Sequence, residues 1–196
     1  MIVFSAEMAG VVFQEVSDCS LSDQKQLRCK LVTKYTGDGQ ADVMAIKHPA
    51  MAVWDPSDDF DDKKEVVLYL IHLVKVNERN LTQKERDENV ERFEIQCRCT
   101  MRGALKEDEW DISGKEQDLN LNHGLVDVAH WCLKYELEKN YEYDLYSSNC
   151  KQFMEALCKA FKIKYDAKDW SDNVLFVAKA VKRSKVTDGC RQKLGC

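Results

Sequence analysis

The sequence predicts an α+β domain, with an antiparallel β-sheet in the first half of the chain and helices in the second half. Two observations carry this prediction. In the first half, apolar and polar residues alternate with the period of two that half-buried strands show. In the second half, apolar residues recur three and four positions apart, as they do along one face of a helix. Consecutive strands without intervening helices favour an antiparallel meander.

Four strands are expected, and each has a distinct pattern. They run from Leu27 to about Thr36, from about Asp42 to Trp54, from Val66 to Val76, and from Phe93 to Met101. The first and fourth alternate almost perfectly, whereas the third is nearly all apolar. A turn at residues 37–39 follows the first strand. The polar connection 55–65 is expected to be a solvent-exposed turn. The charged connection 77–92 is expected to be a solvated loop or short helix, with a mobile flap as the alternative.

Three helices are expected after the strands. The first spans Leu125 to Glu138, and the second carries Phe153, Leu157 and Phe161 at four-residue spacing. The third spans Asn173 to Arg183. The chain has 196 residues, 2 prolines, 8 glycines and no visible linker or repeat, so we expect one domain over residues 1–196. Its core would lie at about residues 41–161, with a C-terminal helix and tail at 171–196. The four tryptophans are interpreted as core residues.

The overall charge and the cysteines limit the class of protein. A net charge of −5 argues against nucleic acid as a main partner. The nine cysteines are scattered through apolar segments, which indicates reduced thiols. The start after Met1 lacks the positive stretch of a signal peptide, and no apolar run approaches the ~20 residues of a membrane span. We therefore expect a cytoplasmic protein. Cys97-Arg98-Cys99 lacks a second pair at zinc-site spacing, so neither a metal nor another cofactor is expected.

The stretch before the second helix carries the candidate chemistry. Ser147, Ser148 and Asn149 favour a helix start, which places Cys150 in the first turn of that helix. Unpaired N–H groups and the positive end of the helix dipole stabilise a thiolate there, and they favour an oxyanion as well. Cys150 is therefore the candidate nucleophile, and Asn149 is the candidate orienting or oxyanion-stabilising residue. The alternative is that Cys150 is a buried structural thiol.

A thiolate nucleophile needs a base, and histidine is the usual one. His48 and His72 lie on apolar faces of the second and third predicted strands, where an imidazole must find a polar partner. If the two strands are neighbours, the rings lie near each other, with one as base and the other orienting it. The alternative is that both are structural histidines of the core. His130 is placed on the helix before Cys150, in a surface or packing role.

Three short patches of the sequence resemble a known family. Ser148-Asn149-Cys150-Lys151-Gln152-Phe153 is similar to the Asn-Cys motif of circularly permuted papain-like enzymes. That group includes lecithin:retinol acyltransferase with its phospholipase/acyltransferase relatives, and the NlpC-type peptidases. The segments around His48 and His72 resemble the two histidine strands that precede the cysteine in the acyltransferase branch. The resemblance implies that Cys150 is the nucleophile, His48 the base and His72 the third member. His72 alone would be the base if Pro49 turns His48 away.

The sequence therefore predicts a thiol hydrolase or acyltransferase that attacks an ester, amide or thioester carbonyl and forms an acyl-enzyme. The substrate would be a lipid, a peptide or an isopeptide. The basic tail, with Lys182, Arg183 and Lys185, is suited to peripheral contact with an anionic membrane surface. The alternative is a papain-like protein that binds or regulates a partner without turnover.

Overall fold

The computed structural model describes residues 21–36, 46–61, 65–76, 81–88, 91–106, 109–139, 142 and 149–165. Over this part of the chain the fold is α+β, as predicted: an antiparallel sheet followed by two helices. The strands are β1 (Gln26–Thr36), β2 (Ile46–Trp54), β3 (Val67–Lys75), β4 (Phe93–Met101), β5 (Trp110–Asp111) and β6 (Glu116–Asn120). The helices are α2 (Gln83–Asp87), the 3-10 turn η2 (Arg102–Ala104), α3 (Leu125–Glu138) and α4 (Cys150–Ala160).

The first four strands form a meander, in which β1 pairs with β2, β2 with β3, and β3 with β4. The order of the sheet is β4-β3-β2-β1-β5, and β6 also pairs with β1. Strand β2 is a central strand, although it contains Pro49. It pairs with β1 along its whole length, but with β3 only from Met51 to Trp54. Proline has no N–H to donate, so it is tolerated where the ladder to β3 has already ended. At Pro49 the strand is thus paired on one side only, with β1.

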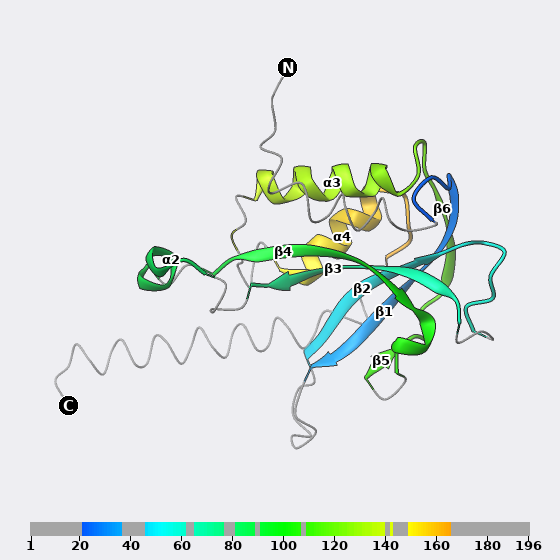
Figure 1. Cartoon of the computed structure of the whole chain (residues 1–196), viewed down its shortest axis with the longest axis horizontal. Coiled ribbons are helices and arrows are strands. Elements are labelled where there is room, and N and C mark those ends of the chain that lie inside the picture. Colours follow the sequence, from blue (N-terminus) through cyan, green and yellow to red (C-terminus); the bar gives the residue numbers. More distant parts are fainter. Residues whose placement is uncertain are drawn as a thin grey trace.

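Helices α3 and α4 lie together on one side of the sheet (Figure 1). Because side chains alternate along a strand, one set of positions faces these helices. On β2 and β3 these are the odd-numbered positions, and they pack with apolar residues of both helices: Met51, Val53, Tyr69, Ile71 and Leu73. We call this side of the sheet the helix face. A second core covers the other side, which we call the far face, with Val32, Ala50, Ala52, Trp54, Leu68 and Leu70.

The far face is covered by connections that the sequence did not mark as buried. Phe60, in the polar connection after β2, is 1% exposed and its ring centroid lies 4.5 Å from that of Trp54. Leu105 and Trp110 complete this cover. The expectation of a purely solvent-exposed turn at 55–65 is therefore wrong at Phe60. The core interpretation of the tryptophans is confirmed for Trp54 and Trp110, which are buried, and Trp131 packs half-buried against the helix-face core.

Most of the predicted elements are confirmed. Strand β4 and helix α3 have the predicted bounds, and β1, β2, β3 and α4 agree with the predictions within a few residues. The charged connection 77–92 contains the short helix α2, which was one of its two expected forms. The short strands β5 and β6 were not predicted. The turn at 37–39, the third helix at 173–183 and the tail at 171–196 lie outside the described residues. A single domain over the whole chain stays a prediction. None of the helices among the described residues is long and apolar enough to cross a membrane.

Candidate functional site

Asn149 fixes the start of the helix that carries Cys150. Its backbone is extended, with φ −128° and ψ 178°, and its side-chain oxygen accepts hydrogen bonds from two backbone N–H groups of the first turn. The donor nitrogens belong to Lys151, at 2.9 Å, and Gln152, at 3.2 Å. This is the geometry of a helix N-cap, for which asparagine is among the preferred residues. The predicted position of Cys150 in the first turn is confirmed.

The surroundings of the Cys150 thiol oppose the activation that the sequence predicted. It packs partly buried against the core of the helix face. Burial raises the pKa of this thiol to about 11, and the backbone N–H groups of Lys151 and Cys150 offset this only in part. A thiolate loses its hydration on burial, and here this cost exceeds the benefit of the helix N-terminus. At neutral pH Cys150 is a thiol, so the expected lowering of its pKa is wrong.

His48 and His72 meet, as the sequence predicted for neighbouring strands. Nε2 of His48 lies 2.9 Å from Nδ1 of His72, a hydrogen-bond distance. The ring centroids are 5.2 Å apart and the ring planes are inclined by 71°. Each imidazole thereby supplies the polar partner that the other needs on a largely apolar sheet.

The surroundings of the histidine pair keep both rings neutral. Lys34 lies opposite His48 in the pairing of β1 with β2, and Gln96 lies opposite His72 in the pairing of β3 with β4. Burial is the main cause that lowers the pKa of each imidazole to about 4, and the positive charge of Lys34 adds to it in both cases. His48 and Arg98 lower the pKa of His72 further, against a hydrogen bond with Gln96. Neither imidazole carries a positive charge at neutral pH.

The histidine pair and Cys150 lie on opposite faces of the sheet. His48 alternates in phase with Ala50 and Ala52, and His72 in phase with Leu70 and Leu68, all of which form the far-face core. Helix α4, which begins with Cys150, packs on the odd-numbered positions of these strands, which form the helix face. The sequence-based prediction that Cys150 meets the imidazole of His48 or His72 is therefore wrong. The physical reason is the period of two along a strand, which sends neighbouring side chains to opposite faces.

The other two histidines have structural positions. His130 is exposed on α3, as expected. Nδ1 of His123 lies 3.0 Å from Oδ1 of Asp127, whose carboxylate also accepts backbone N–H groups before α3. Within the part of the chain that the structure describes, no group of three or more His, Cys, Asp or Glu side chains is placed to hold a metal ion.

Sequence reasoning missed a cavity of about 520 Å³ on the far face, beside β1, β5 and the turn that leads to β6. The lining residues are Lys30, Asp61, Trp110, Asp111, Ile112, Ser113, Gly114 and Glu116. We call this cavity the β5 pocket. The alternation along β1 shows that Lys30 faces away from the helix face. The alternation does not indicate that the Lys30 side chain is buried, because a lysine on the polar face of a strand is expected to face solvent.

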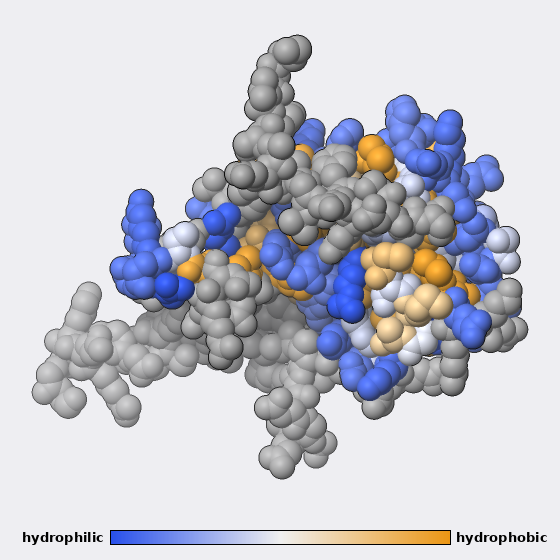
Figure 2. Space-filling view, in the orientation of Figure 1, coloured by the Kyte–Doolittle hydropathy of each residue, from blue (hydrophilic) through white to orange (hydrophobic). Residues whose placement is uncertain are grey.

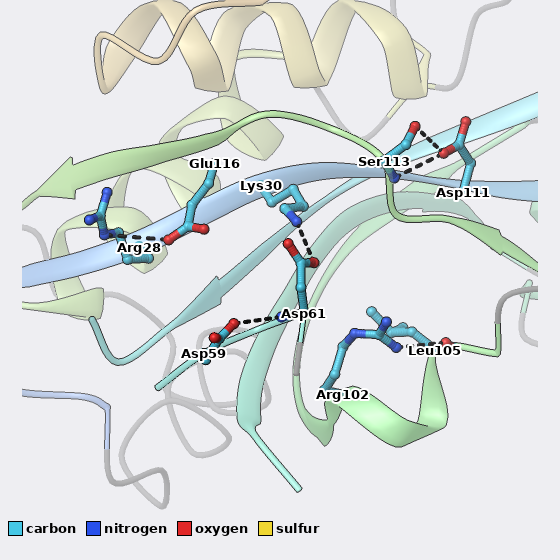
Figure 3. A network of polar contacts seen from close by, with 9 residues as sticks. All are labelled: Arg28, Lys30, Asp59, Asp61, Arg102, Leu105, Asp111, Ser113 and Glu116. Atoms are coloured by element: carbon cyan, nitrogen blue, oxygen red, sulfur yellow. Dashed lines mark hydrogen bonds and ion pairs between the residues drawn. The ribbon is translucent and has the colours of Figure 1, made fainter. Parts of the chain in front are cut away.

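The β5 pocket contains a buried ammonium group. The Lys30 side chain is 5% exposed, and its Nζ donates a hydrogen bond of 2.8 Å to Oδ1 of Asp61, whose side chain is 65% exposed. The same Nζ lies 4.6 Å from the ring centroid of Phe60, and the guanidinium carbon of Arg102 lies 4.9 Å from that centroid. Figure 3 shows the Lys30 ammonium directed at the Asp61 carboxylate. The carboxylate and the aromatic ring together offset the cost of burying this cation.

The turn from β5 to β6 forms a fixed wall of the β5 pocket. Oδ1 of Asp111 accepts hydrogen bonds from the backbone nitrogen of Ser113, at 3.0 Å, and from its hydroxyl, at 2.6 Å (Figure 3). Gly114 lies so close to β1 that a Cβ atom there would be 2.0 Å from the carbonyl oxygen of Leu31. Only glycine permits this approach, so the turn is seated directly on β1.

Comparisons of the chain with protein-family models, with curated proteins and with solved structures gave no match.

Proposed function

We propose that the chain is a binding or effector protein without thiol catalysis, built on a permuted papain-like (NlpC-type) scaffold. The observation that carries the proposal is the separation of Cys150 from His48 and His72 by the sheet. A cysteine enzyme of the predicted kind needs its base within hydrogen-bond reach of the sulfur. The support for the scaffold is the order of the elements, in which antiparallel strands precede a helix that opens with Asn149-Cys150.

The chemistry of the thiol supports the same proposal. Burial raises the pKa of Cys29 and Cys158, which belong to the helix-face core, to about 12. Cys150, with a pKa raised to about 11 for the same reason, resembles these structural thiols. Reactive cysteines have pKa values below that of a free thiol. We therefore assign Cys150 to packing, and Asn149 to capping the helix.

The second candidate is the thiol hydrolase or acyltransferase, and one observation favours it. The backbone N–H groups of Cys150 and Lys151 are directed at the sulfur, where they favour the thiolate. The same two groups would suit the oxyanion of an acyl-transfer intermediate on a lipid, peptide or isopeptide carbonyl. This candidate needs a base other than His48 and His72.

Labelling of the intact protein with a thiol-directed activity probe separates the two candidates. The mass after labelling, followed by peptide mapping, gives the order in which the cysteines react. The binding proposal predicts that the exposed Cys99 reacts before Cys150 at neutral pH. Ester and thioester hydrolysis by the protein should be the same for Cys150→Ala as for the unmodified chain.

Cys99→Ala is the matched control, because it removes an exposed thiol and leaves α4 unchanged. Selective labelling of Cys150, together with turnover that Cys150→Ala abolishes and Cys99→Ala retains, would overturn the binding proposal and establish the enzyme.

A further inference from the structure

We propose that Cys97 of β4 and Cys132 of α3 form a disulfide when the protein meets a small-molecule disulfide such as oxidised glutathione. The pair is thus a modification site, and its disulfide joins helix α3 covalently to the sheet. The proposal goes beyond the proposed function and is independent of it, because neither residue belongs to the surroundings of Cys150 or to the histidine pair.

Helix α3 runs along β4 in a way that brings the two cysteines together. The ring centroids of Phe93 and Tyr135 are 6.2 Å apart, and the backbone nitrogen of Ile95 donates a hydrogen bond of 2.8 Å to Oε1 of Glu136. Cys132 lies one helical turn before Glu136, a rise of about 5.4 Å. Cys97 lies two strand residues after Ile95, a rise of about 6.8 Å. The two steps nearly match, so Cys132 lies beside Cys97.

The two thiols are in contact within the core of the helix face. Cys97 is 2% exposed and Cys132 is 1% exposed, and a side-chain hydrogen bond joins them. Both are free thiols in this structure. A disulfide brings its two sulfurs to about 2 Å from each other, so thiols that are already hydrogen-bonded need only a small further approach. Folding has already closed the chain between residues 97 and 132, which is the main entropic cost of such a bond.

Burial makes the reaction slow but restricts it to the correct partner. The hydrogen bond with Cys97 and the loss of hydration raise the pKa of the Cys132 thiol well above its usual range. The outer side of α3 is polar, with His130, Lys134 and Glu138 exposed. Figure 2 shows mostly hydrophilic residues along the upper rim of the molecule, where α3 lies in Figure 1. The oxidant therefore reaches the pair when α3 opens locally from β4, and the helix returns the two sulfurs to each other when it closes.

The reaction is a pair of thiol–disulfide exchanges. The thiolate of one cysteine attacks a sulfur of oxidised glutathione, which forms a mixed disulfide and releases one glutathione thiolate. The thiolate of the other cysteine then attacks the protein sulfur of the mixed disulfide and releases the second glutathione. The two protons lost by the protein thiols are taken up by the two glutathione thiolates. The protein is oxidised by two electrons, and the glutathione disulfide is reduced by two.

The test is disulfide mapping of the full chain. The reduced protein is incubated with oxidised and reduced glutathione at about pH 8, with and without urea below the unfolding transition, until its thiol content is constant. Free thiols are then blocked with N-ethylmaleimide, and the chain is digested with trypsin without reduction. Trypsin cleaves after Arg98, so Cys97 and Cys99 fall in different peptides. We expect peptide 93–98 linked to peptide 116–134 as the main product, formed faster in urea.

The melting temperature gives a second readout. The disulfide should raise it by about 5 °C or more, and dithiothreitol should reverse the rise. Cys132→Ala should show no rise with the oxidant. Cys158→Ala is the matched control, because it removes an equally buried cysteine of the neighbouring helix, and it should keep the rise. The mapping uses the unmodified chain, so it stands even if Cys132→Ala does not fold.

Three results would overturn the proposal. The first is that Cys97 and Cys132 are still labelled by N-ethylmaleimide when the thiol content has become constant. The second is a Cys97–Cys132 link that is no more abundant than links between other cysteines, such as Cys29 and Cys158, which interact only electrostatically. The third is a rise in melting temperature that Cys132→Ala retains.

Discussion

Nε2 of His48 lies 2.9 Å from Nδ1 of His72, on the face of the sheet that points away from the helix carrying Cys150. The two rings satisfy each other and stay neutral because burial lowers their pKa values. The chain thus has the residue types of a cysteine–histidine site without the geometry. We interpret the histidine pair as a polar link between β2 and β3 at the end where their backbone pairing has stopped.

The histidine pair should make the fold sensitive to acid. The pKa of each imidazole is lowered to about 4 from 6.5, so the unfolded chain takes up protons first as the pH falls. This stability is fully present above about pH 6.5 and is lost as the pH falls toward 4. The pair should contribute a loss on the order of 3 kcal/mol between about pH 7 and about pH 5. This contribution is measured as the difference in urea unfolding between the unmodified chain and the His48→Gln/His72→Gln variant over that range. His130→Gln, an exposed control, should keep the unmodified slope, and an unchanged slope in the double variant would contradict this account.

Glu136 on α3 should act in the opposite direction. This buried carboxylate accepts a hydrogen bond of 2.8 Å from the backbone nitrogen of Ile95, and burial raises its pKa from 4.5 to about 7. The folded state therefore holds the proton more tightly, and stability falls as the pH rises from about 4.5 to 7. Glu136→Gln keeps the acceptor oxygen and should raise stability above about pH 7 by about 2 kcal/mol. Urea unfolding of the variant and of the unmodified chain at several pH values measures this difference in stability. Glu138→Gln on the exposed face is the control, and a destabilised Glu136→Gln at alkaline pH would refute the prediction.

Asn149 should contribute to stability as a cap, whether or not the protein is an enzyme. Replacement by alanine removes the acceptor for the N–H groups of Lys151 and Gln152. We expect Asn149→Ala to lower the free energy of unfolding by about 1 kcal/mol. Asn149→Ser should keep most of the stability that the cap provides, because serine also accepts these hydrogen bonds. Denaturant unfolding of the two variants gives the comparison. Equal stability of the alanine and serine variants would show that the cap hydrogen bonds contribute nothing.

Gly114 should tolerate no side chain. A methyl group there would overlap the carbonyl oxygen of Leu31, so Gly114→Ala must displace the turn from β1. We expect a loss of about 2 kcal/mol or more in the free energy of unfolding, measured by thermal denaturation. Gly103→Ala, at an exposed position of the η2 turn, is the control and should change stability by less than about 1 kcal/mol. A melting temperature for Gly114→Ala equal to that of the control would mean that the turn is not seated as described.

The fold was largely predictable because both periodicities are clear in the sequence. The alternation in β4 and the apolar spacing in α3 gave their bounds correctly. Strands β5 and β6 were missed for a physical reason: β5 has two residues, and β6 buries only Leu119. Phe60 was missed because one aromatic residue in an acidic connection gives no periodic signal.

The candidate site was predictable only in part. The phase of His48 with Ala50, and of His72 with Leu70, could be read from the sequence, and it correctly brought the rings together. The sheet is buried on both faces, so β2 and β3 are apolar on both, and hydrophobicity does not show which face receives the helices. The helix start at Cys150 was also predictable, whereas the extent of its burial depends on packing between distant segments.

The pH dependence of Cys150 alkylation tests the central claim most directly. Iodoacetamide labelling of the folded chain, quantified for each cysteine by mass spectrometry, gives the rate as a function of pH. With a pKa raised to about 11, Cys150 should react slowly at neutral pH, accelerate into the alkaline range, and behave identically in the His48→Gln/His72→Gln variant. A rate that levels off near or below neutral pH, and that falls when the histidines are replaced, would contradict the account.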